Sequence, residues 1–488
     1  MRPARPAAFA ALAATLLAAG CASTHGLAPA NAALDPDALQ AQRTLADARF
    51  SDAAFPAQAW WSAFGDPQLD ALVAEALQDT PSLQAADARV RQAQAQAGLA
   101  DVARKPDLSA SAQVTAVQLP ETLAPAPIGG ELQTSGVLML DFKWAPDLWG
   151  GQRARYDAAV GQVRAAQADA QAARLLLASN VARTYVSLAQ AFEARDVAQR
   201  EAARSGDLSA LSQQRVRAGL DNQLQLRQSE SAVASARQQA QAAAQQIDAL
   251  RNALAALVGR GPDRGLEIAR PALLAAPAPA VPQVMPSELL GHRPDVVAAR
   301  WRVEAAARGI DAQQAAFKPA VNLSAIVGLA APGLRDLFGS DALLGFGGPA
   351  LSLPMFDGER LRADLSARDA DYDLAVAAYN QALVAALREV ADAVQAARAL
   401  EAQLASSTQA RDASQAALSL AQSRYRAGLG TQLDVLAAQR PLLQADQQLA
   451  TLRAQRYVAA IDLDRALGGG LPLQSPTASH DTTASASP

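Results

Sequence analysis

Apolar residues alternate with small or polar residues in four segments of the chain, and this pattern predicts two β-hairpins. The first pair of segments is DLSASAQVTAVQL (107–119) and LQTSGVLMLDFKW (132–144), and the second is AVNLSAIVGLAA (320–331) and LLGFGGPALSLPMF (343–356). A period of two residues bounded by Pro and Gly is typical of strands. In 132–144 one face carries Leu138, Leu140, Phe142 and Trp144, and the other carries Val137, Met139, Asp141 and Lys143.

Long runs without Pro and with hardly any Gly follow each predicted hairpin and are typical of helices. They cover Gln152–Arg217 and Glu359–Arg426, and at 1.5 Å per residue each would span roughly 100 Å. The residues RAGL end each run, and a second helical run leads back from each. Gly costs about 1 kcal/mol relative to Ala inside a helix. We therefore expect Gly219 and Gly428 to be left-handed residues at the tips of two helical hairpins.

The N-terminal residues are typical of a secretion signal, because Arg2 and Arg5 precede the apolar run AAFAALAATLLAAG. That run is too short to span a membrane, which takes about 20 apolar residues. Cys21 follows it and is the only cysteine, so no disulfide can form within the chain. LLAAGC resembles the bacterial lipobox, which implies acylation of Cys21 and, with Ala22 after it, delivery to the outer membrane. The alternative is ordinary cleavage near Ala19 that leaves an incidental cysteine.

The two halves of the chain share one order of motifs, which indicates a tandem duplication. PSLQAADARVRQAQAQAGLADVARKP (81–106) aligns with PDVVAARWRVEAAARGIDAQQAAFKP (294–319), LWGGQRAR aligns with MFDGERLR, and the RAGL lines follow. The predicted organisation is a signal peptide (1–20), a lipidated linker (21–59), a first repeat (60–270, β-hairpin about 107–144, helical tip about 217–222), a Pro/Ala-rich linker (271–285), a second repeat (286–470, β-hairpin about 320–356, helical tip about 426–431) and a disordered tail (471–488).

Composition and charge exclude several classes of function. The apolar half of the chain is mostly Ala, which suits long, closely packed helices, and the net charge of −4 has mixed signs. A nucleic-acid partner would require a basic patch, so none is expected. The three histidines, His25, His292 and His480, lie far apart in the sequence, and no CxxC, GxSxG or P-loop is present. We expect no enzyme, no cofactor and no metal site.

The predicted strands have about 9–13 residues, the length that a tilted membrane strand needs, although soluble hairpins on a helical body are an alternative. Open strand edges are not tolerated in lipid, and bacterial barrels have at least about 8 strands. A chain with four strands must therefore share a barrel with copies of itself. Two chains would give eight strands and three would give twelve. The expected fold is mainly α with a membrane β-barrel portion.

A set of motifs in one order resembles the outer-membrane factors of tripartite efflux systems, which are TolC-like proteins, and in particular their NodT-type lipoprotein branch. The motifs are WWSAFGDPQLDALVAEAL (60–77), DLWGGQRAR (147–155), PSELLGHRPDVVAAR (286–300), LPMFDGERLRA (353–363), REVADAV (388–394) and both RAGL lines. The resemblance implies a homotrimer whose 12-stranded barrel crosses the outer membrane and continues into a long periplasmic α-helical barrel. It further implies passive conduction of drugs or other small molecules.

The resemblance also implies partners and site residues. The partners are a periplasmic adaptor (membrane fusion protein), an inner-membrane resistance-nodulation-division pump and outer-membrane lipid. The adaptor-docking tips would be Ala218, Gly219, Leu220, Ala427, Gly428 and Leu429.

Two acidic residues, three positions apart, often ring the periplasmic aperture in this family. Asp434 matches the first, but Ala437 stands where the second is expected, and Arg440 is a candidate partner for Asp434. Three converging carboxylates would repel one another and raise their pKa.

Aromatic residues next to the hairpins are candidates for a girdle at the periplasmic rim of the barrel. They are Trp144, Trp149 and Phe356. Ordinary packing is the alternative for all three.

Three other functions fit parts of the same pattern. A type I secretion duct or a metal-efflux duct would keep the architecture and change the cargo, which the sequence does not separate. A periplasmic coiled-coil adaptor would lack the membrane barrel, but the chain has no stretch typical of an adaptor's lipoyl-like β domain.

Overall fold

A computed structural model describes residues 23–39, 50–51, 56–120, 122–123, 125, 129–273, 281–282, 291–354 and 356–470. The predicted signal peptide, Cys21 and the tail after Gly470 lie outside these residues, as does most of the predicted linker 271–285. The described residues belong to two compact units. The first takes residues from 1–33, 89–166 and 299–379, and the second from 34–88, 167–298 and 380–488.

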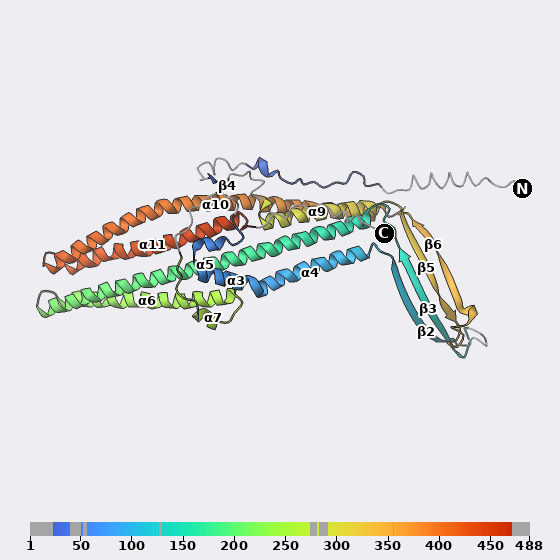
Figure 1. Cartoon of the computed structure of the whole chain (residues 1–488), viewed down its shortest axis with the longest axis horizontal. Helices are drawn as coiled ribbons and strands as arrows, with labels where there is room; N and C mark the ends of the chain where they lie inside the picture. The colour runs from blue at the N-terminus through green and yellow to red at the C-terminus, as the bar shows by residue number, and fades with distance from the viewer. Residues whose placement is uncertain are drawn as a thin grey trace, which may run out of the picture. The chain divides into compact units, whose positions relative to one another are not determined.

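One order of elements occurs twice along the chain (Figure 1). Its first copy is α4 (Pro81–Val102), β2 (Asp107–Gln118), β3 (Leu132–Trp144), α5 (Gly151–Arg217) and α6 (Gln223–Leu257). Its second copy is α9 (Pro294–Ala315), β5 (Ala320–Ala331), β6 (Leu343–Ser352), α10 (Gly358–Arg426) and α11 (Gln432–Ala466). The prediction of a mainly helical chain with four strands for a sheet is confirmed.

Short elements surround these two copies. They are η1 (Pro36–Ala38), β1 (Phe50–Ser51), η2 (Trp60–Phe64), α3 (Pro67–Asp79), α7 (Asp263–Leu266), β4 (Val281–Pro282) and η3 (Ser340–Ala342). β1 and β4 form a two-residue parallel pair.

The first unit contains a four-stranded antiparallel sheet in the order β2-β3-β5-β6 (Figure 1). The strands have 12, 13, 12 and 10 residues, close to what a tilted membrane strand needs. β3 and β5 come from different halves of the chain, so their pairing joins the two hairpins into one sheet.

An N-terminal strap, residues 23–33, lies along α10 in the first unit. The backbone N–H groups of Ala30 and Asn31 donate to the Asp373 carboxylate at 3.1 and 2.8 Å. Leu27 packs against an apolar cluster on α9 and α10 that includes Ile310 and Leu365. The strap therefore has both polar and apolar contacts with the helix.

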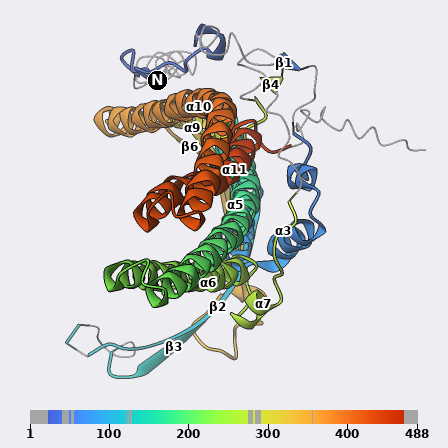
Figure 2. The same ribbon diagram turned by 90° about the vertical axis from the view of Figure 1, so that its left-hand side faces the viewer.

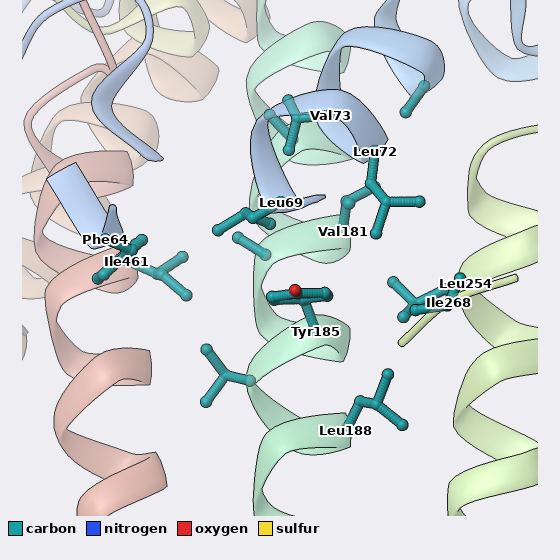
Figure 3. Close-up of a cluster of buried hydrophobic side chains, with 14 of the residues drawn as sticks. Phe64, Leu69, Leu72, Val73, Val181, Tyr185, Leu188, Leu254, Ile268 and Ile461 are labelled. Carbon is teal, nitrogen blue, oxygen red and sulfur yellow. The ribbon is translucent and has the colours of Figure 1, made fainter. Parts of the chain in front are cut away.

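The second unit is built from two antiparallel helix pairs, the later part of α5 with α6 and the later part of α10 with α11 (Figure 2). The apolar core lies where η2 and α3 pack on α5, α6 and α11 (Figure 3). It is filled by large side chains such as Phe64, Leu72, Leu188, Leu254 and Ile461. Elsewhere Ala is common among the buried residues of the long helices, and its small side chain lets helices pack closely.

A buried polar contact lies in the middle of this core. The Tyr185 hydroxyl of α5 donates to Asp66 at 2.7 Å, and Asp66 also accepts from the backbone N–H groups of Gln68 and Ala272. Asp66 therefore caps α3 and ties it to α5. Burial raises the pKa of Tyr185, and the hydrogen bond to Asp66 acts in the same direction.

Replacing Tyr185 by Phe should destabilise the second unit, because Asp66 would stay buried with one donor fewer. A lost bond to a buried charged group costs about 1–3 kcal/mol. The measurement is the thermal unfolding midpoint of the detergent-extracted protein. The matched control is Tyr156→Phe, since Tyr156 is half-buried and its ring lies under Arg104. Equal midpoints for the two variants would contradict this role of Tyr185.

Candidate functional site: the sheet faces and the helical-hairpin tips

One face of the four-stranded sheet is apolar in every strand. Residues that pair directly across antiparallel strands project to the same side, so the register assigns each side chain to a face. From β2 to β6, this face includes Leu108, Ala110, Ala112, Val114, Ala116, Leu132, Leu138, Leu140, Phe142, Trp144, Val321, Leu323, Ala325, Val327, Leu329, Ala331, Leu343, Pro349 and Leu351, with the polar residues Gln118 and Thr134 only at the end near the β2–β3 loop. The alternation predicted for 132–144 thus extends in register across all four strands.

The opposite face is mainly polar. It comprises Ser109, Ser111, Gln113, Thr115, Gln133, Ser135, Asp141, Lys143, Asn322 and Ser324, with a few apolar residues among them. Nearly every residue of β2 and β6 is exposed on both faces. Such a sheet has the composition of a wall between an apolar medium and water.

The two outer strands have free edges within the chain. Among the described residues β2 pairs only with β3, and β6 pairs only with β5. Each outer strand therefore presents a row of backbone N–H and C=O groups with no strand partner. Such groups cost several kcal/mol each if left unpaired in an apolar medium.

The three predicted rim aromatics lie at one end of the sheet or directly after it. Trp144 is the last residue of β3 and pairs with Leu323. The Trp149 Nε1–H donates to the Pro319 carbonyl oxygen at 2.7 Å, and Lys318 lies over its ring. Phe356 precedes α10 and is almost fully exposed. Pro319 and Trp149 therefore join the two halves of the first unit beside the sheet.

The two helical tips have the same backbone geometry. Gly219 and Gly428 have φ of 71° and 75°, the left-handed region that Gly adopts readily. The Leu220 N–H donates to the Arg215 carbonyl at 2.9 Å, and the Leu429 N–H donates to the Arg424 carbonyl at 2.8 Å. These bonds are those of a Schellman motif, so the role predicted for the two glycines in ending helices is confirmed.

Both tips expose leucine side chains. Leu220 is 65% exposed and Leu429 is 71% exposed, although the residue at this position of the motif commonly makes an apolar contact. Leu224 and Leu433, the second residues of α6 and α11, are similarly exposed. Each tip therefore presents two uncovered leucines. Ala218 and Ala427 donate backbone hydrogen bonds to Gln214 and Ser423.

Asp434 forms a capping box at the start of α11. Its carboxylate accepts from the Thr431 N–H at 2.7 Å and from the Thr431 hydroxyl at 2.9 Å, and its own N–H donates to that hydroxyl. These bonds, with a smaller contribution from nearby Arg424, lower the pKa of Asp434. The carboxylate of Asp434 in one chain is therefore ionised at neutral pH. Repulsion between carboxylates of neighbouring copies would raise the pKa instead.

The suggested pairing of Asp434 with Arg440 is not formed in the described part of the chain. The two residues are six positions apart on α11, so their side chains point about 120° apart around the helix axis. Asp434 contacts Thr431 instead, and Arg440 is exposed.

A polar network joins the two helical hairpins just before their tips. The Tyr425 hydroxyl donates to Asp221, and Arg215 donates to the same carboxylate at 3.1 Å. The Arg215 guanidinium also lies over the Tyr425 ring, 4.6 Å from its centre. We call Arg215, Asp221 and Tyr425 the tip network. It connects the turn of the first hairpin to the last helical residues of α10.

Tyr425 stays a hydrogen-bond donor over the whole neutral range. It is 1% exposed, and burial together with the bond to Asp221 raises its pKa to about 12. Because this pKa lies above the value of about 10 in unfolded chains, the stabilisation is fully present below pH about 10. It is lost as the pH rises through about 12.

Two residues of the tip network lie at positions where the sequences of the two tips differ. RVRAGLDNQL and RYRAGLGTQL differ at three positions, and two of the changes are Val216 against Tyr425 and Asp221 against Gly430. The bond between Tyr425 and Asp221 joins one residue from each of these two positions. The third change, Asn222 against Thr431, keeps the same N-cap role in both tips.

Every helix in the described part of the chain is too short or too polar to cross a membrane. Within the same residues, no group of three or more His, Cys, Asp or Glu side chains is placed to hold a metal ion.

Comparison with known proteins identifies the family. The family model described as outer membrane efflux protein matches residues 72–260 and 285–469. The fusaric acid resistance protein FusA of Burkholderia cepacia is 39% identical over 372 residues, which cover 74% of this chain and 69% of FusA. The pyoverdine export outer membrane protein OpmQ of Pseudomonas putida is 33% identical over 458 residues, or 93% of this chain and 94% of OpmQ.

A solved structure has the same fold. The crystal structure of the outer membrane protein VceC from Vibrio cholerae matches with a TM-score of 0.80 and 37% identity, covering 86% of this chain and all of that one. The family predicted from the ordered motifs is thus confirmed, while the NodT-type branch stays a prediction. Both family-model matches and the relatives agree: this chain belongs to the outer membrane efflux protein family.

Proposed function

We propose that this chain is one subunit of a homotrimeric outer-membrane exit duct. The duct passively conducts small molecules from a periplasmic adaptor and an inner-membrane resistance-nodulation-division pump to the exterior. The observation that carries the proposal is the sheet, which has an apolar face, a polar face and two free edges. Three copies joined edge to edge would form a closed 12-stranded barrel with lipid outside and water inside.

Small organic molecules are the cargo class we propose. FusA is named for resistance to fusaric acid and OpmQ for export of pyoverdine. Both names refer to organic compounds, which favours organic cargo over protein secretion or metal export.

The proposal places acylated Cys21 in the outer membrane as a lipid anchor. Its support is the N-terminal strap, which begins two residues after Cys21 and is held on α10 by Asp373 in the unit that carries the sheet. Palmitate labelling that persists in Cys21→Ser would show that acylation lies elsewhere.

Trp144, Trp149 and Phe356 fit the proposed girdle at the periplasmic rim, because they lie at or beyond the ends of β3 and β6. Aromatic side chains favour the boundary between lipid and water. Weak quenching of tryptophan fluorescence by lipids brominated near the headgroup would argue against this placement.

Single-channel recording in a planar bilayer tests the duct directly. We expect small, cation-selective currents, because Asp434 carries a negative charge at the start of α11 and three copies would ring the aperture. Asp434→Asn should lower the cation-to-anion permeability ratio while keeping the cap, since Asn also accepts a bond from Thr431. Asp341→Asn, the same change in the first unit, is the matched control and should leave the ratio unaltered. An unchanged ratio in Asp434→Asn would remove Asp434 from the gate.

Weakening the tip network should enlarge the currents. The double variant Tyr425→Phe, Asp221→Asn removes the bond between the two hairpins and the charge that Arg215 contacts. If this network holds the tips in a narrow arrangement, the mean conductance should rise above that of wild type. Tyr379→Phe, on the same helix α10, is the control. Equal conductance in the double variant and wild type would leave the network with a structural role alone.

Adaptor docking is proposed for Ala218, Gly219, Leu220, Ala427, Gly428 and Leu429. The uncovered leucines support it, because exposed apolar side chains gathered at one place mark interaction sites.

Gly428→Asp should strongly reduce drug export in cells that carry the pump and adaptor, with assembly unchanged, because a charge would stand among the tip leucines. No atom lies within 4 Å of a Cβ at Gly428, but its φ is 75°, so the matched control is Gly428→Asn, which has the same backbone requirement and size without the charge. Full export by Gly428→Asp would contradict the docking assignment.

A further inference from the structure

The polar face of the sheet also carries apolar side chains, and the largest of them gather together, while Val117, Val137, Ala320, Ala330 and Ala350 lie elsewhere on the same face. In the register, Phe346 pairs with Ile326, Ile326 pairs with Asp141, and Met139 and Leu344 both pair with Gly328. All of these residues therefore project to the polar face, in two adjacent rows across β3, β5 and β6. We call Met139, Ile326, Leu344 and Phe346 the inner apolar patch.

The patch is open to solvent within the chain. Phe346 is 62% exposed, and Gly348, which follows it on the same face of β6, has no side chain to cover the ring. Gly328, between Met139 and Leu344, has no room for a Cβ, because one would lie 2.2 Å from the Leu138 carbonyl oxygen. Four large apolar side chains in two adjacent rows of a face rich in Ser, Thr, Gln and Asn indicate a contact surface rather than scattered exposed residues.

A negative charge lies in the same row as the patch. Asp141 is half-buried and forms no ion pair among the described residues. Asp107 and Lys143 are direct cross-strand partners of opposite sign in the next row, so their charges largely offset each other. The unbalanced charge beside Ile326 and Phe346 is therefore that of Asp141, which favours a positively charged group.

We propose that the inner apolar patch and Asp141 form a binding site for cationic aromatic amphiphiles on the channel wall. The proposal rests on the proposed function, in which the polar face lines the conduit. Strands lie about 4.8 Å apart, so two strand spacings place Asp141 roughly 10 Å from Phe346. A molecule with a positive group and an aromatic body can contact both at once. The ring of Phe346 offers stacking and cation–π contacts, and Asp141 offers the charge.

Block of the channel current by three organic ions tests the site. The probes are tetraphenylphosphonium, an aromatic cation, tetrabutylammonium, an aliphatic cation, and tetraphenylborate, an aromatic anion. Recordings use the Tyr425→Phe, Asp221→Asn channel, so that the tips do not limit the current. In this channel with Asp141 and Phe346 intact, tetraphenylphosphonium should block the current at a lower concentration than either of the other two ions.

Two substitutions separate the two parts of the site. Asp141→Asn should weaken block by both cations about fivefold, the effect of one charge at about 4 Å in water, and should not weaken block by tetraphenylborate. Phe346→Ala should weaken block by both aromatic ions, which lose ring stacking, more than block by tetrabutylammonium, which loses only a cation–π contact. Asp341→Asn, in the loop between β5 and β6, and Leu343→Ala, on the apolar face of β6, are the matched controls.

The outcomes separate this proposal from the function on which it rests. Block that stays the same in Asp141→Asn and Phe346→Ala, through a channel that conducts, overturns the binding site alone. Equal weakening by Leu343→Ala would also overturn it, because the face would not matter. No current through the tip-opened protein would contradict the proposed function itself.

Discussion

The unpaired backbone groups at the two edges of the sheet are the constraint on which the rest of the structure depends. β2 and β6 each leave one row of N–H and C=O groups without a strand partner, and their side chains are exposed on both faces. In water such edges invite aggregation, and in lipid they are too costly to persist. The edges run antiparallel, as the strand order requires, so β2 of one chain can pair with β6 of the next. A closed ring of copies satisfies every edge and gives the apolar and polar faces their separate solvents.

The two helical hairpins have nearly equal lengths, but the side-chain contacts at their tips differ. The Schellman turns at Gly219 and Gly428 are the same in both halves. The contacts beside them differ, because Tyr425 and Asp221 have no counterparts in the other repeat. Duplication therefore supplies a symmetric frame, while two changes of residue supply a specific bond between the hairpins. A few polar contacts between the hairpins can fix the positions of the tips, and breaking these contacts would let the tips move apart.

The sequence alone predicts the features that depend on local rules. Four strands follow from a period of two, the long helices from the absence of Pro, and the tips from two glycines; each is confirmed. The tip network and the bond between Tyr185 and Asp66 were not predicted, because they join residues far apart in sequence and depend on packing. The capping box of Asp434 could have been found, since TQLD has the spacing of such a box. Within one chain Asp434 does not pair with Arg440, because residues six apart on a helix do not share a face.

The inner apolar patch shows a similar limit. The alternation in 132–144 already separates Met139 and Asp141 from Leu138 and Leu140, but it does not reveal which residues of β5 and β6 lie beside them. That information comes from the register across three strands. A one-residue slip would move every side chain to the other face, so any inference about the lining of the duct depends on this register.

Disulfide cross-linking between β2 and β6 of different chains would test the central claim most directly. One cysteine would replace Gly345, where an added Cβ meets nothing closer than 3.9 Å, and the other would replace Ala110, Ala112 or Ala116 on the same face of β2. Oxidation in the native membrane should give a ladder of covalent species that ends at three chains, for at least one of the three pairs. A ladder that ends at two chains, or cross-links within a single chain only, would contradict a barrel closed by three copies.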